Sequence, residues 1–233
     1  MADRHDPTFT RRVVLSTLPA ALTLAPLNAH AQLRRSQNGT TDMAPTVLPN
    51  DVVRLETFDE VQVRVGDIVV YMHYEALEGR EFPYMKRVLA LPGQRIAFRE
   101  GVPVLDGAVA ASTYLATEDL RYELAGPTVH PGLRRHRETL AGKTYETYYS
   151  SASENAGVMR SCQIFRGERT CRTRDIRNTE EVLVPLGHLF VVGDNRDVSE
   201  DSRWDGPIAI ASVRGRAVSI LTSHDPSRVG AEL

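Results

Sequence analysis

The chain has 233 residues, of which 42% are hydrophobic and 25% charged, so it can bury the core of one large or two modest globular domains. Its formal net charge of −2 argues against a nucleic-acid-binding protein, because such proteins are normally basic. The sequence contains neither a phosphate-cradling glycine loop nor a histidine spacing typical of a metal site, and it therefore predicts no cofactor and no metal.

The first 31 residues are predicted to be a signal peptide or a membrane anchor. Arg11 and Arg12 precede an apolar stretch at 13–29, as in a twin-arginine export signal, and the small-x-small triplet at 29–31 is typical of a cleavage site. The stretch is shorter than the roughly 20 residues of a spanning helix, and its two prolines also favour a cleaved signal over a retained anchor. Either way, the body of the chain is expected on the extracytoplasmic, periplasmic side, exported or anchored to the inner membrane.

Stretches rich in β-forming residues follow in chain order. Val, Ile, Tyr and Phe dominate 52–55, 66–74 and 83–98, and the last of these contains a tight turn at Pro92 and Gly93, so all three are predicted to be strands. Residues 99–181 are less regular and are predicted to be an inserted β region with glycine and proline turns. Apolar runs at 182–192 and 207–220 predict further strands.

The only two cysteines of the chain, Cys162 and Cys171, both lie in the inserted region. Two cysteines cannot build a structural zinc site, and they are not spaced as a CxxC pair. In an exported chain they are predicted to form one disulfide that closes a hairpin, which would contribute about 2 to 3 kcal/mol for a loop of roughly ten residues. Two free thiols remain the alternative.

A polar stretch, VVGDNRDVSEDSRWDG at 191–206, separates the last two apolar runs. Its composition is typical of a solvated surface loop. Its opposite charges, with Ser199 and Ser202 between them, would alternatively form a hydrogen-bonded scaffold that holds one hydroxyl in place. Composition alone leaves both interpretations open.

The polar stretch closely resembles the GDNRxxSxDSR box of bacterial type I signal peptidases, the membrane-anchored Ser/Lys endopeptidases that remove secretory signal peptides. KRVLALPGQ, which begins at Lys86, resembles the KRVxGLPGD box of this family, with departures at Ala90 and Gln94. DMAPTV resembles the SMxPTL nucleophile box, except that Asp42 stands where the family has its serine. With these boxes in the family's order, the chain is identified as a member.

The resemblance implies a role for each matching residue. Lys86 falls at the general base, Ser199 at the hydroxyl that orients this lysine, and Thr40 with the Asp42 backbone amide at the site that binds the oxyanion. The supporting residues of the polar stretch are then Asp194, Arg196, Asp201, Ser202 and Arg203. The substrate cleft is expected to include Met43, Tyr84 and Met85.

Asp42 conflicts with this mechanism in two ways. A carboxylate that attacks an amide would form a high-energy anhydride, so the acyl-enzyme route lacks its nucleophile. A carboxylate about 4 Å from Lys86 would also favour the ammonium form by about 4 kcal/mol at an effective dielectric near 20, whereas a general base must be neutral. The sequence therefore predicts an ion pair between Asp42 and Lys86, and little or no serine-type proteolysis.

Three functions are compatible with the sequence. The chain is a signal peptidase-like protein that binds extended signal peptides of preproteins, as an added strand, without cleaving them. Alternatively, it is an endopeptidase that uses a displaced hydroxyl of Thr40 or Thr41, or a water activated by Asp42. The third possibility is a non-catalytic factor of an envelope secretion or conjugation system. Its partners are therefore signal peptides, and the membrane if residues 1–31 are retained.

The expected fold is mostly β, with a signal peptidase-type β core and an inserted second β region. The predicted parts are 1–31 as a signal peptide or anchor, 32–98 with 182–222 as the catalytic-type core, 99–181 as the insert, and 223–233 as a tail.

Overall fold

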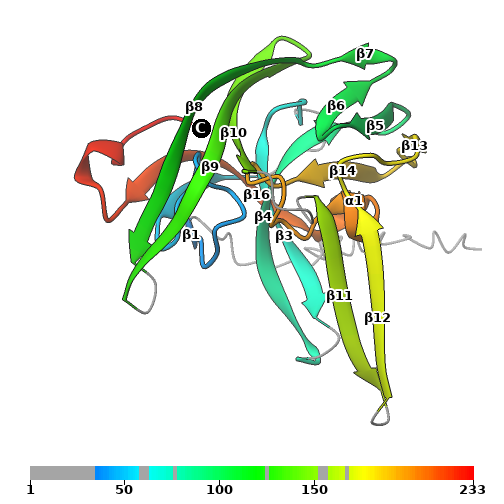
Figure 1. Cartoon of the computed structure of the whole chain (residues 1–233), viewed down its shortest axis with the longest axis horizontal. Coiled ribbons are helices and arrows are strands. Elements are labelled where there is room, and N and C mark those ends of the chain that lie inside the picture. The colour runs from blue at the N-terminus through cyan, green and yellow to red at the C-terminus, as the bar shows by residue number, and fades with distance from the viewer. Residues whose placement is uncertain (1–34, 58–62, 76–77, 124–125, 152–156, 166–167) are drawn as a thin grey trace, which may run out of the picture. The chain divides into compact units, whose positions relative to one another are not determined.

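The computed structural model describes residues 35–57, 63–75, 78–123, 126–151, 157–165 and 168–233, and for residues 159–165 and 168–172 it describes the backbone alone. The predicted signal peptide or anchor at 1–31 lies outside the described residues. Among the residues that are described, no helix combines the length and the apolar character that a membrane crossing requires. The described chain is mostly β, as the sequence predicts (Figure 1).

The core is one antiparallel sheet of seven strands, which joins segments from both ends of the described chain (Figure 1). In order across the sheet, the strands are β1 (Arg35–Gln37), β2 (Val52–Glu56), β16 (Val213–Thr222), β3 (Ile68–Glu75), β4 (Arg80–Ala90), β14 (His188–Val192) and β15 (Ile208–Ala209). The predicted strands at 52–55 and 66–74 are therefore confirmed as β2 and β3, and the sheet places β4, which carries Lys86, between β3 and β14.

Residues of β3 alternate between two apolar clusters, because successive side chains of a strand point to opposite faces of the sheet. Ile68 and Val70 pack on one face, in the cluster Met43, Val47, Val53, Leu55, Met85 and Ala217. Val69 and Tyr71 pack on the other, in the cluster Val88, Leu189, Val191, Ile210 and Val213. Each fully buried aliphatic side chain contributes about 1.5 to 3 kcal/mol, so both faces of this strand stabilise the sheet.

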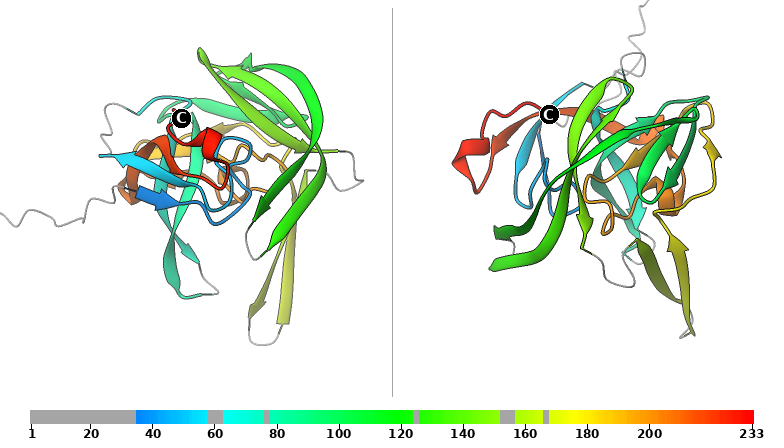
Figure 2. Two further views of the ribbon diagram at one scale, coloured as in Figure 1. Left: turned by 90° about the vertical axis from the view of Figure 1, so that its left-hand side faces the viewer. Right: turned by 45° about the horizontal axis from the view of Figure 1, so that its top comes forward.

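The predicted insert folds as further antiparallel β structure (Figures 1 and 2). A curved three-stranded sheet contains β8 (Ala111–Glu123), β9 (Pro127–Leu140) and β10 (Lys143–Ser150), and β11 (Val158–Phe165) pairs with β12 (Glu168–Asp175) as a hairpin. A four-stranded sheet contains β13 (Val182–Leu183), β5 (Arg95–Arg99), β6 (Val102–Leu105) and β7 (Ala108–Val109). Because β5 pairs with β6, the predicted boundary at residue 98 cuts through this sheet.

The hairpin of β11 and β12 carries both cysteines. Its register places Cys162 directly opposite Cys171. Directly opposed residues of antiparallel strands have Cα atoms about 4.5 to 5.5 Å apart, which lies within the range that a disulfide spans. The side chains of both residues lie outside the described part of the structure, so the disulfide stays a prediction.

The three helices among the described residues are short: α1 (Ser202–Asp205), η2 (Ile210–Ser212) and η3 (Pro226–Arg228). Residues 223–233, interpreted from the sequence as a tail, pack back onto the core. The Gly230 backbone N–H donates to the carbonyl of Ile220 at 2.8 Å, and Leu233 contacts the cluster that contains Met43. The C-terminal segment therefore packs against the core, although none of its own residues is buried.

Candidate active site

The segment that carries Asp42 is held by hydrogen bonds from Asn38, shortly before it in the chain, and from Asn195 in the polar stretch. The amide of Asn38 donates to the carbonyls of Thr40 and Val47, at 2.9 and 3.0 Å. The backbone N–H of Asn195, in the polar stretch, donates to the carbonyl of Asp42 at 2.9 Å, and its side-chain amide donates to that of Thr41 at 3.2 Å. The fold thus brings the nucleophile-box segment against the polar stretch.

Lys86 and Asp42 form the ion pair that the sequence predicts. Lys86 Nζ lies 2.7 Å from Asp42 Oδ2, and the two side chains are 2% and 20% exposed. The ammonium also lies 5.2 Å from the centre of the Tyr84 ring. A buried ammonium without a partner would lose most of its solvation free energy, so the carboxylate stabilises the protonated lysine at this position.

Ser199 is completely buried, and its hydroxyl has no hydrogen-bond partner among the described residues. It packs at Gly193, where an added Cβ would overlap the Ser199 side chain and come within 2.6 Å of the carbonyl oxygen of Asp42. The absence of a side chain at Gly193 therefore allows residues 199 and 42 to approach each other. Since Lys86 donates to Asp42 instead, the orienting role of Ser199 stays a prediction.

Thr40 and the Asp42 amide, the predicted oxyanion-binding groups, lie side by side at the surface. The Asp42 backbone N–H donates to the Thr40 hydroxyl at 3.4 Å, which is a long hydrogen bond. The Thr40 hydroxyl also lies 3.5 Å from the side-chain oxygen of Asn38. Both groups line the groove described below, so neither is sequestered in the core.

The polar stretch is a buried scaffold, and the interpretation as a solvated loop is wrong. Asp194 accepts from Arg87 Nε and Nη2 at 2.8 and 2.6 Å, which is a bidentate pair between buried side chains. Burial lowers the pKa of Arg87, but the charge and hydrogen bonds of Asp194 outweigh burial and leave this pKa raised. Arg87 was not among the predicted site residues, although its place beside Lys86, on the opposite face of a strand, was a usable signal.

Arg196 extends into the inserted region. Its guanidinium donates to Glu138 of β9 at 2.6 and 3.1 Å, and both side chains are buried. The hydroxyl of Tyr149 donates to the same carboxylate at 2.6 Å. Burial opposes the charge of Arg196, yet the field of Glu138 raises its pKa well above the usual value. No pattern in the sequence distinguishes Glu138 from the other charged residues of β9.

Asp201 and Ser202 hold the end of the polar stretch to β14. Asp201 accepts from Arg203 Nε and Nη2 at 2.9 and 2.7 Å and from the Gly193 backbone N–H at 3.0 Å. Burial raises the pKa of Asp201, but Arg203 and the Gly193 amide outweigh burial, and the resulting pKa is lowered. The hydroxyl of Ser202 accepts from the backbone N–H of Val191 at 3.0 Å. All five predicted supporting residues are therefore buried and positioned by the scaffold.

A groove of about 830 Å³ opens beside the Lys86 to Asp42 pair. It is lined by β1 and the residues after it, by the β3 to β4 hairpin, and by Val198 and Glu200 of the polar stretch. Tyr84 and Met85 line this groove, and their place in a substrate cleft stays a prediction. Met43 does not line it: its side chain is completely buried in the core with Val47 and Ile68, because an apolar side chain directed inward removes more surface from water.

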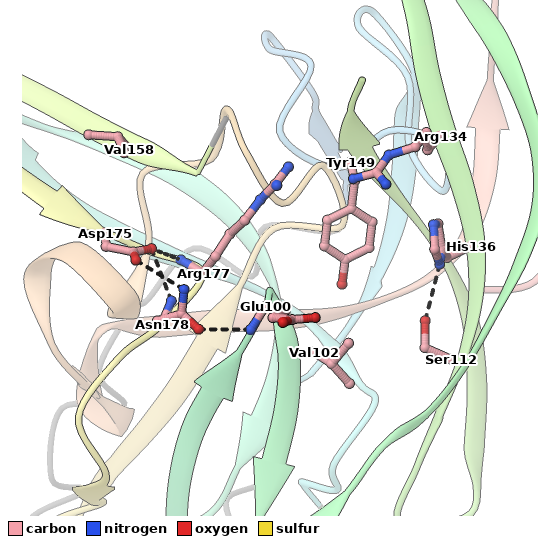
Figure 3. Close-up of a pocket in the computed structure, with 10 residues that line it drawn as sticks. All are labelled: Glu100, Val102, Ser112, Arg134, His136, Tyr149, Val158, Asp175, Arg177 and Asn178. Carbon is pink, nitrogen blue, oxygen red and sulfur yellow. Dashed lines mark hydrogen bonds between the residues drawn. The ribbon is translucent and has the colours of Figure 1, made fainter. Parts of the chain in front are cut away.

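A second cavity, of about 520 Å³, lies in the inserted region (Figure 3). Figure 3 shows His136 directed at the hydroxyl of Ser112, 3.2 Å away, and Asp175 accepting hydrogen bonds beside Arg177. None of the predicted site residues lines this cavity. Arg177 Nε lies 2.8 Å from the carboxylate of Asp197, a residue of the polar stretch. The positive charge of Arg177 is therefore already balanced by this carboxylate.

Comparison with known proteins places these features in context. Residues 10–222 match the family model described as signal peptidase, peptidase S26. Signal peptidase I of Rickettsia bellii is 28% identical over 145 residues, which cover 60% of this chain and 40% of that protein. The Rickettsia conorii protein of the same name is 29% identical over 143 residues, 59% of this chain and 43% of its own. The matches therefore span less than half the length of these relatives.

A solved structure of a signal peptidase I from Enterococcus faecalis is also similar to the chain. It is 23% identical, has a TM-score of 0.32, and the match covers 66% of this chain and 96% of that one.

Proposed function

Because the chain belongs to the signal peptidase family, peptidase S26, we propose that its groove binds extended signal peptides of exported preproteins and does not cleave them by the serine mechanism. The observation that carries this proposal is the contact of 2.7 Å between Lys86 Nζ and Asp42 Oδ2 at the groove. The protein would act on the extracytoplasmic side, with residues 1–31 as its signal peptide or anchor.

The ion pair is incompatible with acyl transfer on two counts. A carboxylate at position 42 offers no hydroxyl that could form an ester intermediate. In the proposed ion pair the lysine is an ammonium that donates to Asp42, and an ammonium does not accept a proton from a nucleophile. The remaining parts of the site, including the buried scaffold behind Asp42, are present.

The form of the groove supports a peptide ligand. Its volume lies within the range of about 300 to 1,000 Å³ that is usual for ligand pockets. The groove is lined by Ser36 and Gln37 of β1, which is an edge strand of the seven-stranded sheet among the described residues. A sheet edge of this kind presents backbone groups that can pair with a further strand. An extended peptide recognised by strand addition would bond to such an edge and place alternate side chains in the groove.

The decisive experiment compares the chain with its Asp42→Ser variant on a purified preprotein that carries a signal peptide. Cleavage by the variant alone is expected, because the serine would restore the nucleophile and leave Lys86 without its carboxylate partner. Asp42→Ser combined with Lys86→Met should be inactive and serves as the control. Equal cleavage by the unmodified chain and the variant would refute the proposal. Absence of peptide binding by the unmodified chain would refute it as well.

An endopeptidase that uses a displaced hydroxyl has less support. The Thr40 hydroxyl contacts Asn38 and the Asp42 amide, and the amine of Lys86 is bonded to Asp42. Such an enzyme would cleave without any change at position 42, so the same experiment separates the two functions.

A further inference from the structure

The charges that line the groove are unequal. Four carboxylates line it, against two basic side chains: Asp42, Glu75, Glu78 and Glu200 against Arg80 and Lys86. Lys86 is already paired with Asp42, and the Arg80 guanidinium lies over the Phe82 ring, 4.4 Å from its centre. The groove therefore has a negative field that its own residues leave partly uncompensated.

Tyr84 lies between a carboxylate of the groove and the ion pair. Its hydroxyl donates to Glu75, and its ring lies 5.2 Å from Lys86 Nζ. Burial, the hydrogen bond to Glu75 and the charges of Glu75, Glu200 and Asp42 together raise the pKa of Tyr84. All three carboxylates thus act on one hydroxyl on the wall beside Lys86.

Among the described residues that line the groove, Glu78 and Glu200 are the carboxylates without an ion-pair partner, and Glu200 is the more buried of the two. Glu75 accepts the hydrogen bond of Tyr84, whereas the strongest electrostatic influences on Glu200 come from Asp205, Glu75, His73 and Asp42, of which only His73 can carry positive charge. Burial and these negative charges raise the pKa of Glu200. A half-buried carboxylate among like charges is stabilised by a cation that reaches it.

We propose that Glu200 makes the groove selective for extended peptides that carry a lysine or arginine side chain within reach of its carboxylate. The inference rests on the proposed function, since it names the class of peptide that the same groove prefers. A basic side chain can extend its apolar stem along Tyr84 or Val198 and place its charge at Glu200.

The test measures the affinity of the full chain for fluorescein-labelled peptides by anisotropy. Each peptide carries a small-x-small motif, and one residue is walked through the flanking positions as either lysine or norleucine, which has a similar stem without the charge. At one or two positions, the lysine peptide should bind about fivefold to tenfold more tightly than the matching norleucine peptide, which defines an affinity ratio for each position. This ratio should fall when the salt concentration is raised, because a groove open to solvent is screened.

Two substitutions test whether Glu200 is responsible for the preference for lysine over norleucine. Glu200→Gln should bring the ratio close to one, whereas Glu81→Gln, which removes an exposed carboxylate of β4 outside the groove, should keep it. A ratio near one at every position in the unmodified chain, or a ratio that survives Glu200→Gln, would overturn this inference and leave the proposed function standing. If no peptide binds, both fail.

Discussion

The guanidinium of Arg196 and the carboxylate of Glu138 form a bidentate ion pair, at 2.6 and 3.1 Å, between side chains that are 1% and 0% exposed. The partners lie 58 positions apart, one in the polar stretch and one in the inserted region. The insert is therefore joined to the scaffold behind the candidate active site, and it contributes to the site's stability.

Replacement of Glu138 by alanine should destabilise the protein strongly, by about 3 to 5 kcal/mol, because Arg196 would remain buried without a counter-charge. Urea denaturation measures the change. Glu146→Ala is the matched control, since Glu146 pairs with Arg137 at a partly exposed position and its loss should change stability by about 0 to 1 kcal/mol. Equal losses for both variants would contradict the structural role of the buried pair.

A double-mutant cycle at Asp42 and Lys86 should reveal a coupling of about 1 to 3 kcal/mol, the size expected for a partly shielded, charged hydrogen bond. Asp42→Asn leaves the ammonium without its counter-charge, and Lys86→Met leaves the carboxylate without its donor. The double variant should therefore be more stable than the sum of the two single changes predicts. Additive effects in chemical denaturation would show that the pair does not form in solution.

The stability of the protein should fall in acid partly through Asp201. The pKa of this carboxyl is lowered from its usual value of 3.8 in the folded state, since Arg203 and the Gly193 amide outweigh burial. A lowered pKa stabilises the fold above the unfolded pKa, and this contribution is lost as the pH falls through the folded pKa. Asp201→Asn should flatten the stability curve between about pH 5 and about pH 2. An unchanged acid slope would refute this assignment.

Arg228 should stabilise the segment that carries Asp42. Its guanidinium donates to the carbonyl of Thr46 at 2.8 Å and to the buried carboxylate of Asp51 at 3.1 Å. Arg228→Ala should destabilise the protein by about 1 to 3 kcal/mol and accelerate hydrogen exchange at Val47, whose N–H donates to the Met43 carbonyl.

Arg228→Lys provides the control, since a single ammonium can replace only part of the planar guanidinium's contacts. It should give an intermediate exchange rate at Val47. Unchanged exchange in both variants would show that the C-terminal segment does not support this turn.

Local patterns were sufficient for much of the site. The abundance of β-forming residues in β3 predicted a strand, and the resemblance of the boxes around Asp42 and Lys86 to those of signal peptidases predicted an ion pair that the fold contains. A strand is predictable because it depends on neighbouring residues in the chain, and the site residues were predictable because each lies in a short box whose sequence is recognisable.

Contacts between residues far apart in the chain could not be predicted from the sequence. The partners Arg87 to Asp194 and Arg196 to Glu138 are 107 and 58 positions apart, and a single sequence contains no signal that pairs them. The burial of Met43 could not be predicted from the sequence either. An apolar side chain at this point in the chain is equally compatible with a ligand-binding surface and with the core.

By itself, the amino-acid sequence determined the β class of this protein, its family and the identity of the charged pair at residues 42 and 86. Only the tertiary structure decided that the polar stretch at 191–206 is largely buried, that Glu138 compensates Arg196, and that residues 223–233 fold back against the core. The physical reason is that charge and hydropathy are properties of single residues, whereas burial depends on which distant segments cover them.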